Sequence, residues 1–158
     1  RFFTAYGPWG RPDMALFKFT KAIIEGKKMD VYNNGNMYRD FTYIDDIVNS
    51  IKSLIRVIPK NTKKSNSSKI DSLSSVAPFR VVNIGNSNKV KLIDFIKEIE
   101  KVLGKKAICN YMPLQKGDVP KTIANTNLLK KLTKRKPKIN FKEGVRKFVE
   151  WYLDYYKK

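Results

Sequence analysis

The sequence predicts an α/β fold, because short stretches rich in β-forming residues alternate along the chain with segments of helical periodicity. With 42% hydrophobic and 12% aromatic residues, the chain is apolar enough to bury a core. Its 158 residues correspond to one domain or a large part of one. The expected order is strand, helix, two strands, helix, loop, strand, helix, strand and two helices.

The chain begins with a predicted strand and helix. Residues 1–8 (RFFTAYGP) form a strand that runs into a turn, and a start inside a strand indicates the carboxy-terminal part of a longer protein. Residues 13–25 are expected to form a helix, with Asp13 as its amino-terminal cap and Gly26 as its end. Its apolar residues recur at helical spacing: Leu16, Phe19 and Ile23.

Two further strands and a second helix are expected next. Residues 29–35 (MDVYNNG) predict a short strand entering a turn, whose Asn-Gly pair suits positive φ. Residues 39–44 (RDFTYI) are rich in β-formers, and Asp45 is placed to cap the following helix. The predicted apolar face of that helix consists of Ile47, Ile51 and Ile55.

A polar segment divides the chain at about residues 60–78, and it is expected to be a flexible loop inserted at the surface. Residues 79–85 (FRVVNIG) predict a buried strand, and a helix is expected over residues 87–104, with Gly104 ending it. Four residues form the predicted buried face of this helix: Leu92, Ile96, Ile99 and Leu103.

The last part of the chain predicts a strand at residues 106–114 and a short helix at 125–132, which the KRKPK turn ends. The final helix is expected over residues 142–156. Its aromatic tail is interpreted as core and docking surface, because the spacing is helical. The predicted buried face of the final helix consists of Val145, Phe148, Val149, Tyr152 and Tyr156.

The strongest compositional signal is a formal net charge of +19. From residue 101 onward there are 16 Lys or Arg residues against 4 Asp or Glu residues. A basic module for nucleic acid or another polyanion is one interpretation. The interpretation we favour is a lysine-rich composition that covers solvated faces, because the lysines are spread over several predicted helices.

Cysteine usage and hydropathy point to a cytoplasmic protein. A single cysteine, Cys109, excludes an internal disulfide framework and fits a reducing compartment. No apolar run is long enough to span a membrane, and no signal peptide is visible.

The residues needed for several kinds of catalysis are missing. The chain has no histidine, and its one cysteine cannot make the usual zinc sets, so no metal site is expected. It has neither a GxGxxG glycine pattern nor a Tyr followed four positions later by Lys. No catalytic residue is therefore assigned, and the chain is better suited to holding a ligand.

Several polar side chains stand beside glycines and prolines in predicted turns. Arginine suits phosphate or carboxylate, because its planar fork makes two charge-assisted hydrogen bonds. Asp118 could accept hydrogen bonds from a sugar diol, and Tyr32 offers an apolar face to a flat base. Together they would fit a nucleotide diphosphate joined to an acidic sugar, although each also suits an ordinary turn or cap. The candidates are Thr4, Arg11, Tyr32, Arg39, Gln115 and Asp118.

These motifs resemble the NAD-dependent epimerase/dehydratase family, the extended short-chain dehydrogenases/reductases, and most of all the UDP-glucuronate 4-epimerases. The resemblance covers nearly the whole chain. Its blocks are RFFTAYGPWGRPDMALFKFTKAIIEGK, VYNNGNMYRDFTYIDDIV, VVNIGNS, PLQKGDVPKT and FKEGVRKFVEWYLDYY. The first two blocks together are the specific ones, and the polar loop before FRVVNIG resembles a variable insertion of these epimerases.

The resemblance implies a role for each candidate. Thr4 and Arg11 match positions that hold the hexuronic carboxylate. Arg39 matches the arginine on the UDP diphosphate, Tyr32 falls where uracil is sandwiched, and Asp118 matches the residue that binds the uridine ribose. The sixth candidate, Gln115, stands where related epimerases often carry Arg, and Asn125 stands where the family often has Asp.

The resemblance also implies the carboxy-terminal substrate-binding portion of a Rossmann-type fold, lacking most of the NAD-binding sheet. The parent protein would be a homodimeric, NAD-dependent UDP-glucuronate 4-epimerase that forms UDP-galacturonate, with NAD held mainly by the amino-terminal half. The chain alone is expected to be inactive, because the glycine fingerprint and the Tyr-Lys pair are absent. The alternatives are a UDP-glucuronate decarboxylase, a dTDP-glucose dehydratase, a non-catalytic nucleotide-sugar module or the polyanion-binding module.

Overall fold

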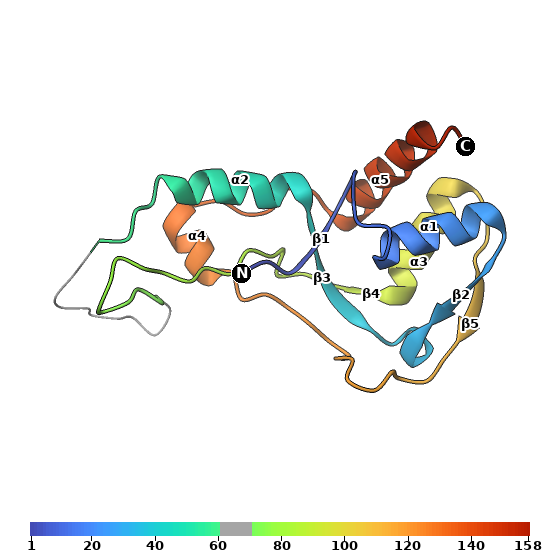
Figure 1. The fold of residues 1–158 in the computed structure, drawn as a ribbon, viewed down its shortest axis with the longest axis horizontal. Helices are drawn as coiled ribbons and strands as arrows, with labels where there is room; N and C mark the ends of the chain where they lie inside the picture. The colour runs from blue at the N-terminus through green and yellow to red at the C-terminus, as the bar shows by residue number, and fades with distance from the viewer. Residues whose placement is uncertain (61–70) are drawn as a thin grey trace.

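A computed structural model describes residues 1–60 and 71–158 of the chain. Helices α1, α3 and α5 gather at one end of the molecule, together with strands β2 and β5, and α2 and α4 lie together at the other end. Strands β1, β3 and β4 lie between the two groups (Figure 1). The described helices are α1 (Ala15–Glu25), α2 (Ile44–Ile55), α3 (Leu92–Leu103), α4 (Asn127–Thr133) and α5 (Phe141–Tyr155), with a 3-10 turn η1 at Tyr32–Gly35.

The strands form two small sheets. In the first, β1 (Thr4–Tyr6) runs parallel to β3 (Tyr38–Tyr43), and β3 runs antiparallel to β4 (Lys89–Lys91). In the second, β2 (Lys28–Val31) runs parallel to β5 (Ile108–Tyr111). The α/β prediction is therefore confirmed.

The core fills the space between the three-stranded sheet and helices α1, α3 and α5. Phe41 of β3 stacks on Phe95 of α3 with ring centroids 4.3 Å apart, and Tyr6 of β1 meets both rings edge-on. Gly144 lets α5 approach Tyr6, because a Cβ there would lie 2.2 Å from the Tyr6 hydroxyl oxygen. The Tyr6 ring thus joins β1 to α5.

Two predicted boundaries in the middle of the chain are wrong. Residues 79–85 form no strand and contribute only a bridge between Ile84 and Phe2, and the predicted helix begins at Leu92 instead of residue 87. The reason lies in Asp40, whose carboxylate accepts the backbone N–H groups of Asn86 and Ser87 at 2.8 and 2.9 Å. Ser87 also has φ +58°, which a helix does not allow.

The two predicted aspartate caps are also wrong, whereas the glycine ends of α1 and α3 are confirmed at φ +63°. Asp13 precedes the cap position of α1 and pairs with Arg11 instead. Asp45 lies within the first turn of α2, whose cap position makes no side-chain hydrogen bond. The neighbouring Asp46 is buried and accepts the backbone N–H groups of residues 138 and 139, both at 3.0 Å.

The apolar faces of the helices are confirmed to different degrees. The predicted faces of α1 and α5 are buried except for Tyr156, which is 40% exposed. Of the predicted face of α2, only Ile47 is buried, while Ile51 and Ile55 are 38% and 70% exposed. Ile44 and Val48 are exposed as well, so an apolar stripe of α2 has no cover within the described residues.

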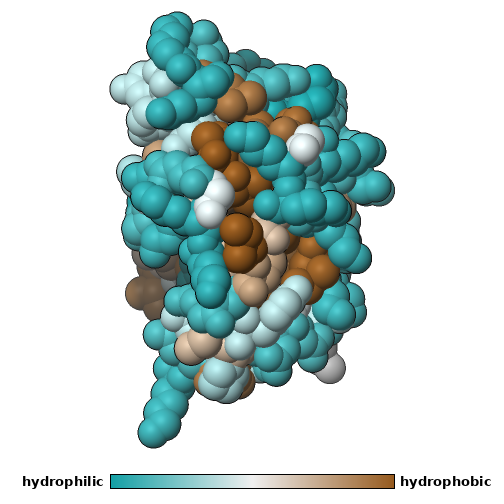
Figure 2. Space-filling view, turned by 90° about the vertical axis from the view of Figure 1, so that its right-hand side faces the viewer, coloured by the Kyte–Doolittle hydropathy of each residue, from teal (hydrophilic) through white to brown (hydrophobic). Residues whose placement is uncertain are grey.

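The surface at the α1–α5 end is mostly hydrophilic, with a narrow apolar band running down its middle (Figure 2). Among the helices of residues 1–60 and 71–158, none is long and apolar enough to cross a membrane. Of the predicted polar loop at about 60–78, residues 61–70 lie outside the described residues. Residues 71–78 form no helix or strand, and Asp71 makes a two-point ion pair with Arg80 at 2.8 and 3.1 Å.

Candidate functional site

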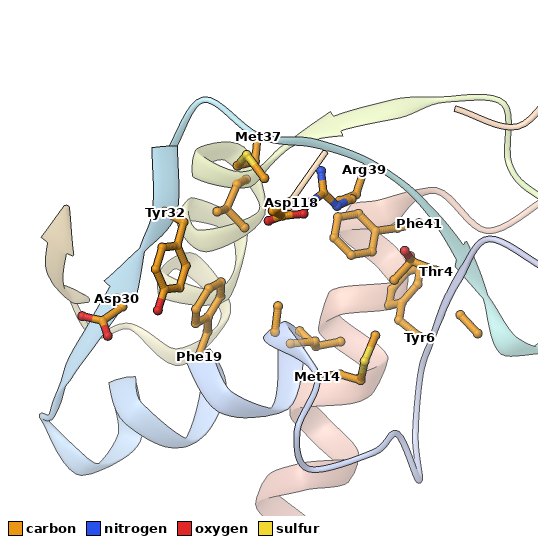
Figure 3. A pocket seen from close by; sticks show the side chains of 14 residues that line it. Thr4, Tyr6, Met14, Phe19, Asp30, Tyr32, Met37, Arg39, Phe41 and Asp118 are labelled. Atoms are coloured by element: carbon orange, nitrogen blue, oxygen red, sulfur yellow. Dashed lines mark hydrogen bonds and ion pairs between the residues drawn. The ribbon is translucent and has the colours of Figure 1, made fainter. Parts of the chain in front are cut away.

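Two cavities adjoin along strand β1 and share four lining residues, Thr4, Ala5, Tyr6 and Met14. The first cavity, of about 240 Å³, opens where β3, η1, α1 and the segment after β5 converge (Figure 3). The second cavity, of about 700 Å³, lies under the loop that joins β1 to α1. The distribution of the six candidates over these cavities defines the candidate site.

Arg39 and Asp118 form an ion pair beside the first cavity. They point toward each other (Figure 3), with Arg39 Nη2 2.7 Å from Asp118 Oδ1. Arg39 Nη1 also donates to the backbone oxygen of Val119 at 2.6 Å. The Arg39 side chain is 22% exposed and that of Asp118 is 37% exposed. A half-buried, permanently charged guanidinium at a cavity wall is suited to binding an anion.

The buried Asp40 carboxylate fixes the segment that carries Asp118. Besides the N–H groups of Asn86 and Ser87, it accepts that of Ala124 at 2.9 Å. Tyr38 at the start of β3 also exchanges backbone hydrogen bonds with the segment, at residues 120 and 122. The pair between Arg39 and Asp118 therefore depends on contacts between distant parts of the chain.

Tyr32 closes the other side of the first cavity, near Phe19 of α1 (Figure 3). The ring is half-buried and begins the turn η1. The predicted positive φ is confirmed, with φ of +51°, +48° and +76° at Asn33, Asn34 and Gly35. An added Cβ at Gly35 would lie 2.3 Å from Ile93, so glycine is needed there for space as well.

Arg11 lines the second cavity and makes a two-point contact with Asp13. Its Nε donates to Asp13 Oδ1 at 3.0 Å, and its Nη2 donates to Oδ2. The hydrogen bond from Arg11 lowers the pKa of Asp13, and the same bond raises the pKa of Arg11. Both side chains are more than half exposed, so solvent screens this pair.

The loop between β1 and α1 is held against α5 by aromatic contacts. Trp9, with φ +62°, packs against Trp151 and Tyr155 with centroid distances of 5.3 and 4.9 Å. The indole nevertheless stays 71% exposed and lines the second cavity beside Arg11. These contacts fix the backbone that presents Arg11.

Five of the six predicted residues line the two cavities, and Gln115 does not. Its side chain is exposed, and its backbone oxygen accepts the N–H of Asp118 at 3.1 Å. Sequence reasoning missed the apolar lining of the first cavity, including Met14 and Phe19, and the acidic side chain of Asp30. The spacing of Phe19 predicts a position in the helix core, and that spacing does not distinguish a core position from a cavity wall.

Part of the basic charge is concentrated at a third cavity. This cavity of about 390 Å³ between α2 and α4 is lined by Lys52, Arg56 and Arg135, with no acidic side chain among its lining residues. Both helices end here, at Ile55 and Thr133. Cations stabilise helix carboxyl ends, which accounts for this cluster without a ligand.

The glycine pattern that cradles a dinucleotide phosphate is absent from the sequence. Gly7, which follows β1, makes room for a side chain instead, because an added Cβ would lie 2.7 Å from Ile44. Within residues 1–60 and 71–158, no group of three His, Cys, Asp or Glu side chains could hold a metal ion.

Comparison with known proteins identifies the family. The model of the NAD dependent epimerase/dehydratase family matches residues 1–85. The chain belongs to this family. Over its whole length it is 55% identical to Protein CapI of Staphylococcus aureus and 52% identical to a probable UDP-glucuronate 4-epimerase of Rhizobium meliloti. It covers 47% of each of these proteins, so the epimerase/dehydratase chain spans about half the length of the curated relatives it matches.

Solved structures agree with this assignment. The UDP-glucuronic acid 4-epimerase of Bacillus cereus, in complex with UDP-glucuronic acid and NAD, superposes with a TM-score of 0.79 at 27% identity. The match covers 99% of this chain and 45% of that one. The predicted family and the partial short-chain dehydrogenase/reductase fold are therefore confirmed.

Proposed function

We propose that this chain forms the UDP-sugar-binding part of a UDP-glucuronate 4-epimerase. The observation that carries the proposal is the placement of Arg39 and Arg11 at two adjoining cavities that share the β1 wall. One cationic fork is available to a diphosphate and the other to a carboxylate, as a UDP-uronate requires. The 52% identity to a probable UDP-glucuronate 4-epimerase supports the same substrate class.

The first cavity would take the UDP moiety. Arg39 would bind the diphosphate, and Asp118 would accept hydrogen bonds from the ribose hydroxyls. Tyr32 and Phe19 would enclose the uracil between apolar faces. Because Asp40 ties together the segments that carry Arg39 and Asp118, these groups are already ordered before a ligand arrives.

The second cavity would take the sugar, with Arg11 and Thr4 holding its carboxylate. The family is NAD-dependent, and bound NAD supplies the hydride transfer that C4 epimerisation needs. We propose that NAD is held mainly by the part of the protein outside this chain. Gly7, the glycine that follows β1, makes room for Ile44 and is not placed to cradle a phosphate. The role left to this chain is to bind the nucleotide and to orient the uronate. Cytoplasmic location and a homodimeric parent stay predictions.

Binding measurements on the chain with UDP-glucuronate, UDP-glucose and UDP would test the proposal. Arg39→Leu should weaken all three ligands by about ten- to a hundredfold, because each loses a charge-assisted contact. Arg11→Leu should weaken UDP-glucuronate selectively, by roughly tenfold. Equal losses for UDP-glucose and UDP-glucuronate in Arg11→Leu would contradict the assignment of the second cavity.

A decarboxylase or a dehydratase would use the first cavity for its nucleotide in the same way. Selectivity for UDP-glucuronate over UDP-glucose would separate the epimerase from the dehydratase. The polyanion-binding alternative would use the third cavity, between α2 and α4, which is lined by basic side chains. Binding to that cavity would depend steeply on salt and would be indifferent to Arg39→Leu. That result, without any UDP binding, would replace the proposed function.

A further inference from the structure

The pair between Arg11 and Asp13 has an arrangement that the proposed uronate site does not by itself require. Arg11 lines the second cavity, whereas Asp13 is absent from its lining. Asp13 therefore contacts the guanidinium from outside the cavity. Its two carboxylate oxygens take Nε and Nη2, which is one edge of the guanidinium.

A guanidinium has five N–H donors, and two edges that can each meet a carboxylate with parallel hydrogen bonds. The contact with Asp13 uses one hydrogen on Nε and one on Nη2. Three donors stay available, two on Nη1 and one on Nη2, and one from each nitrogen forms the end edge of the group. Arg11 can therefore hold Asp13 and a second carboxylate at the same time.

The backbone around the pair is ordered as well. The N–H of Met14 donates to the backbone oxygen of Arg11 at 3.1 Å, which closes a turn across residues 11–14. On the preceding side, Gly10 N–H donates to the oxygen of Gly7 at 3.2 Å, and Trp9 packs on α5. The turn sets the relative positions of the two side chains, and Asp13 then removes the torsional freedom of an exposed arginine.

We propose that Asp13 is a positioning residue that holds Arg11 with its end edge directed at the second cavity, so that the site selects an acidic sugar over a neutral one. This inference rests on the proposed function. Asp13 cancels the charge of Arg11 at long range, so selection would come from two-point geometry at contact. The alternative is that Arg11 and Asp13 form an ordinary exposed ion pair, which would have no measurable effect on the stability of the chain or on its selectivity for the sugar.

The readout that distinguishes the two is the selectivity ratio, defined as the dissociation constant for UDP-glucose divided by that for UDP-glucuronate. Asp13→Asn should lower this ratio by about two- to tenfold, because a pre-ordered side chain is lost. Asp13→Glu should recover part of it. The matched control is Asp154→Asn. It removes an exposed aspartate of α5 that pairs with Lys157, and it should leave the ratio unchanged.

A second measurement does not depend on any ligand. The Nε–H resonance of Arg11 should be protected from solvent exchange in the wild-type chain and should lose that protection in Asp13→Asn. An unchanged or higher selectivity ratio in Asp13→Asn, with protection lost, would overturn the proposal. If the wild-type ratio is near one and Arg11→Leu does not alter it, the proposed function itself has failed and this inference falls with it.

Discussion

The two arginine–aspartate pairs of the site are built in opposite ways. Arg39 and Asp118 are 79 residues apart and half-buried, and both bond to the backbone of Val119: Arg39 donates to its oxygen, and Asp118 accepts its N–H. Arg11 and Asp13 are two residues apart, and both are more than half exposed. The first pair exists only because the tertiary structure brings its members together, whereas the second is formed by one turn of the loop before α1.

This difference suggests a division of labour. A pair embedded in the fold provides a rigid anchor, which suits the nucleotide common to all substrates of such a site. A pair on a surface loop can change without disturbing the fold, and under the proposed function it would face the part of the ligand that distinguishes one sugar from another. The predicted effects fall from the carboxylate that supports the first pair, through the first pair itself, to the second pair.

The largest effect is expected from the carboxylate that supports the first pair. Asp40→Ala leaves three backbone N–H groups without their acceptor in a buried site, which should lower the free energy of unfolding by about 3 kcal/mol. Urea denaturation measures this change. Asp13→Ala is the matched variant on the second pair, and we expect no measurable change there. Similar losses in both would show that the pairs are not built differently.

A smaller effect is expected from the first pair itself. Asp118→Ala removes the partner of Arg39 and the acceptor of the Val119 N–H, so unfolding should become easier by about 0.5–1 kcal/mol. Thermal denaturation compared with Asp13→Ala measures the difference. An equal midpoint for the two variants would contradict the claim that only the first pair is part of the folded framework.

The smallest effect concerns the ionisation of Asp13. Its pKa is lowered, chiefly by the hydrogen bond from Arg11, so the carboxylate stays ionised to lower pH than an ordinary aspartate does. The pair is thus present at neutral pH and is lost as the pH falls through this lowered pKa. Arg11→Leu should raise the Asp13 pKa toward its ordinary value in a pH titration followed by NMR. No change would mean that the pair does not form in solution.

The sequence predicted the second pair's location better than its chemistry. The family resemblance assigns Arg11 to the sugar carboxylate, which stays a prediction. The predicted helix cap at Asp13 is wrong, although an Asp before an apolar run usually is one. The donor that Asp13 binds is the Arg11 guanidinium, not a backbone N–H of the helix. Both residues of the first pair are predicted as ligand-binding residues, from their types beside turns and from the family resemblance. Their contact could not be foreseen, because nothing local connects positions 39 and 118.

The errors elsewhere have the same origin. Residues 79–85 have the composition of a strand. The conformation of the chain there is set by the hydrogen bonds that the N–H groups of Asn86 and Ser87 donate to the distant Asp40 carboxylate. Helical periodicity predicts the position of α2 correctly, but it does not indicate which surface its apolar residues pack against. Ile51 and Ile55 are exposed in the described residues, while the predicted faces of α1 and α5 are covered by each other and by α3.

The central claim is that two adjoining cavities divide one ligand between them, and a pair of NMR titrations tests it most directly. UDP alone should shift the resonances of Tyr32, Arg39 and Asp118 and leave Arg11 unchanged. UDP-glucuronate should shift the same three and, in addition, Thr4 and Arg11. Shifts confined to Lys52, Arg56 and Arg135 between α2 and α4, with the β1 cavities silent, would contradict the account.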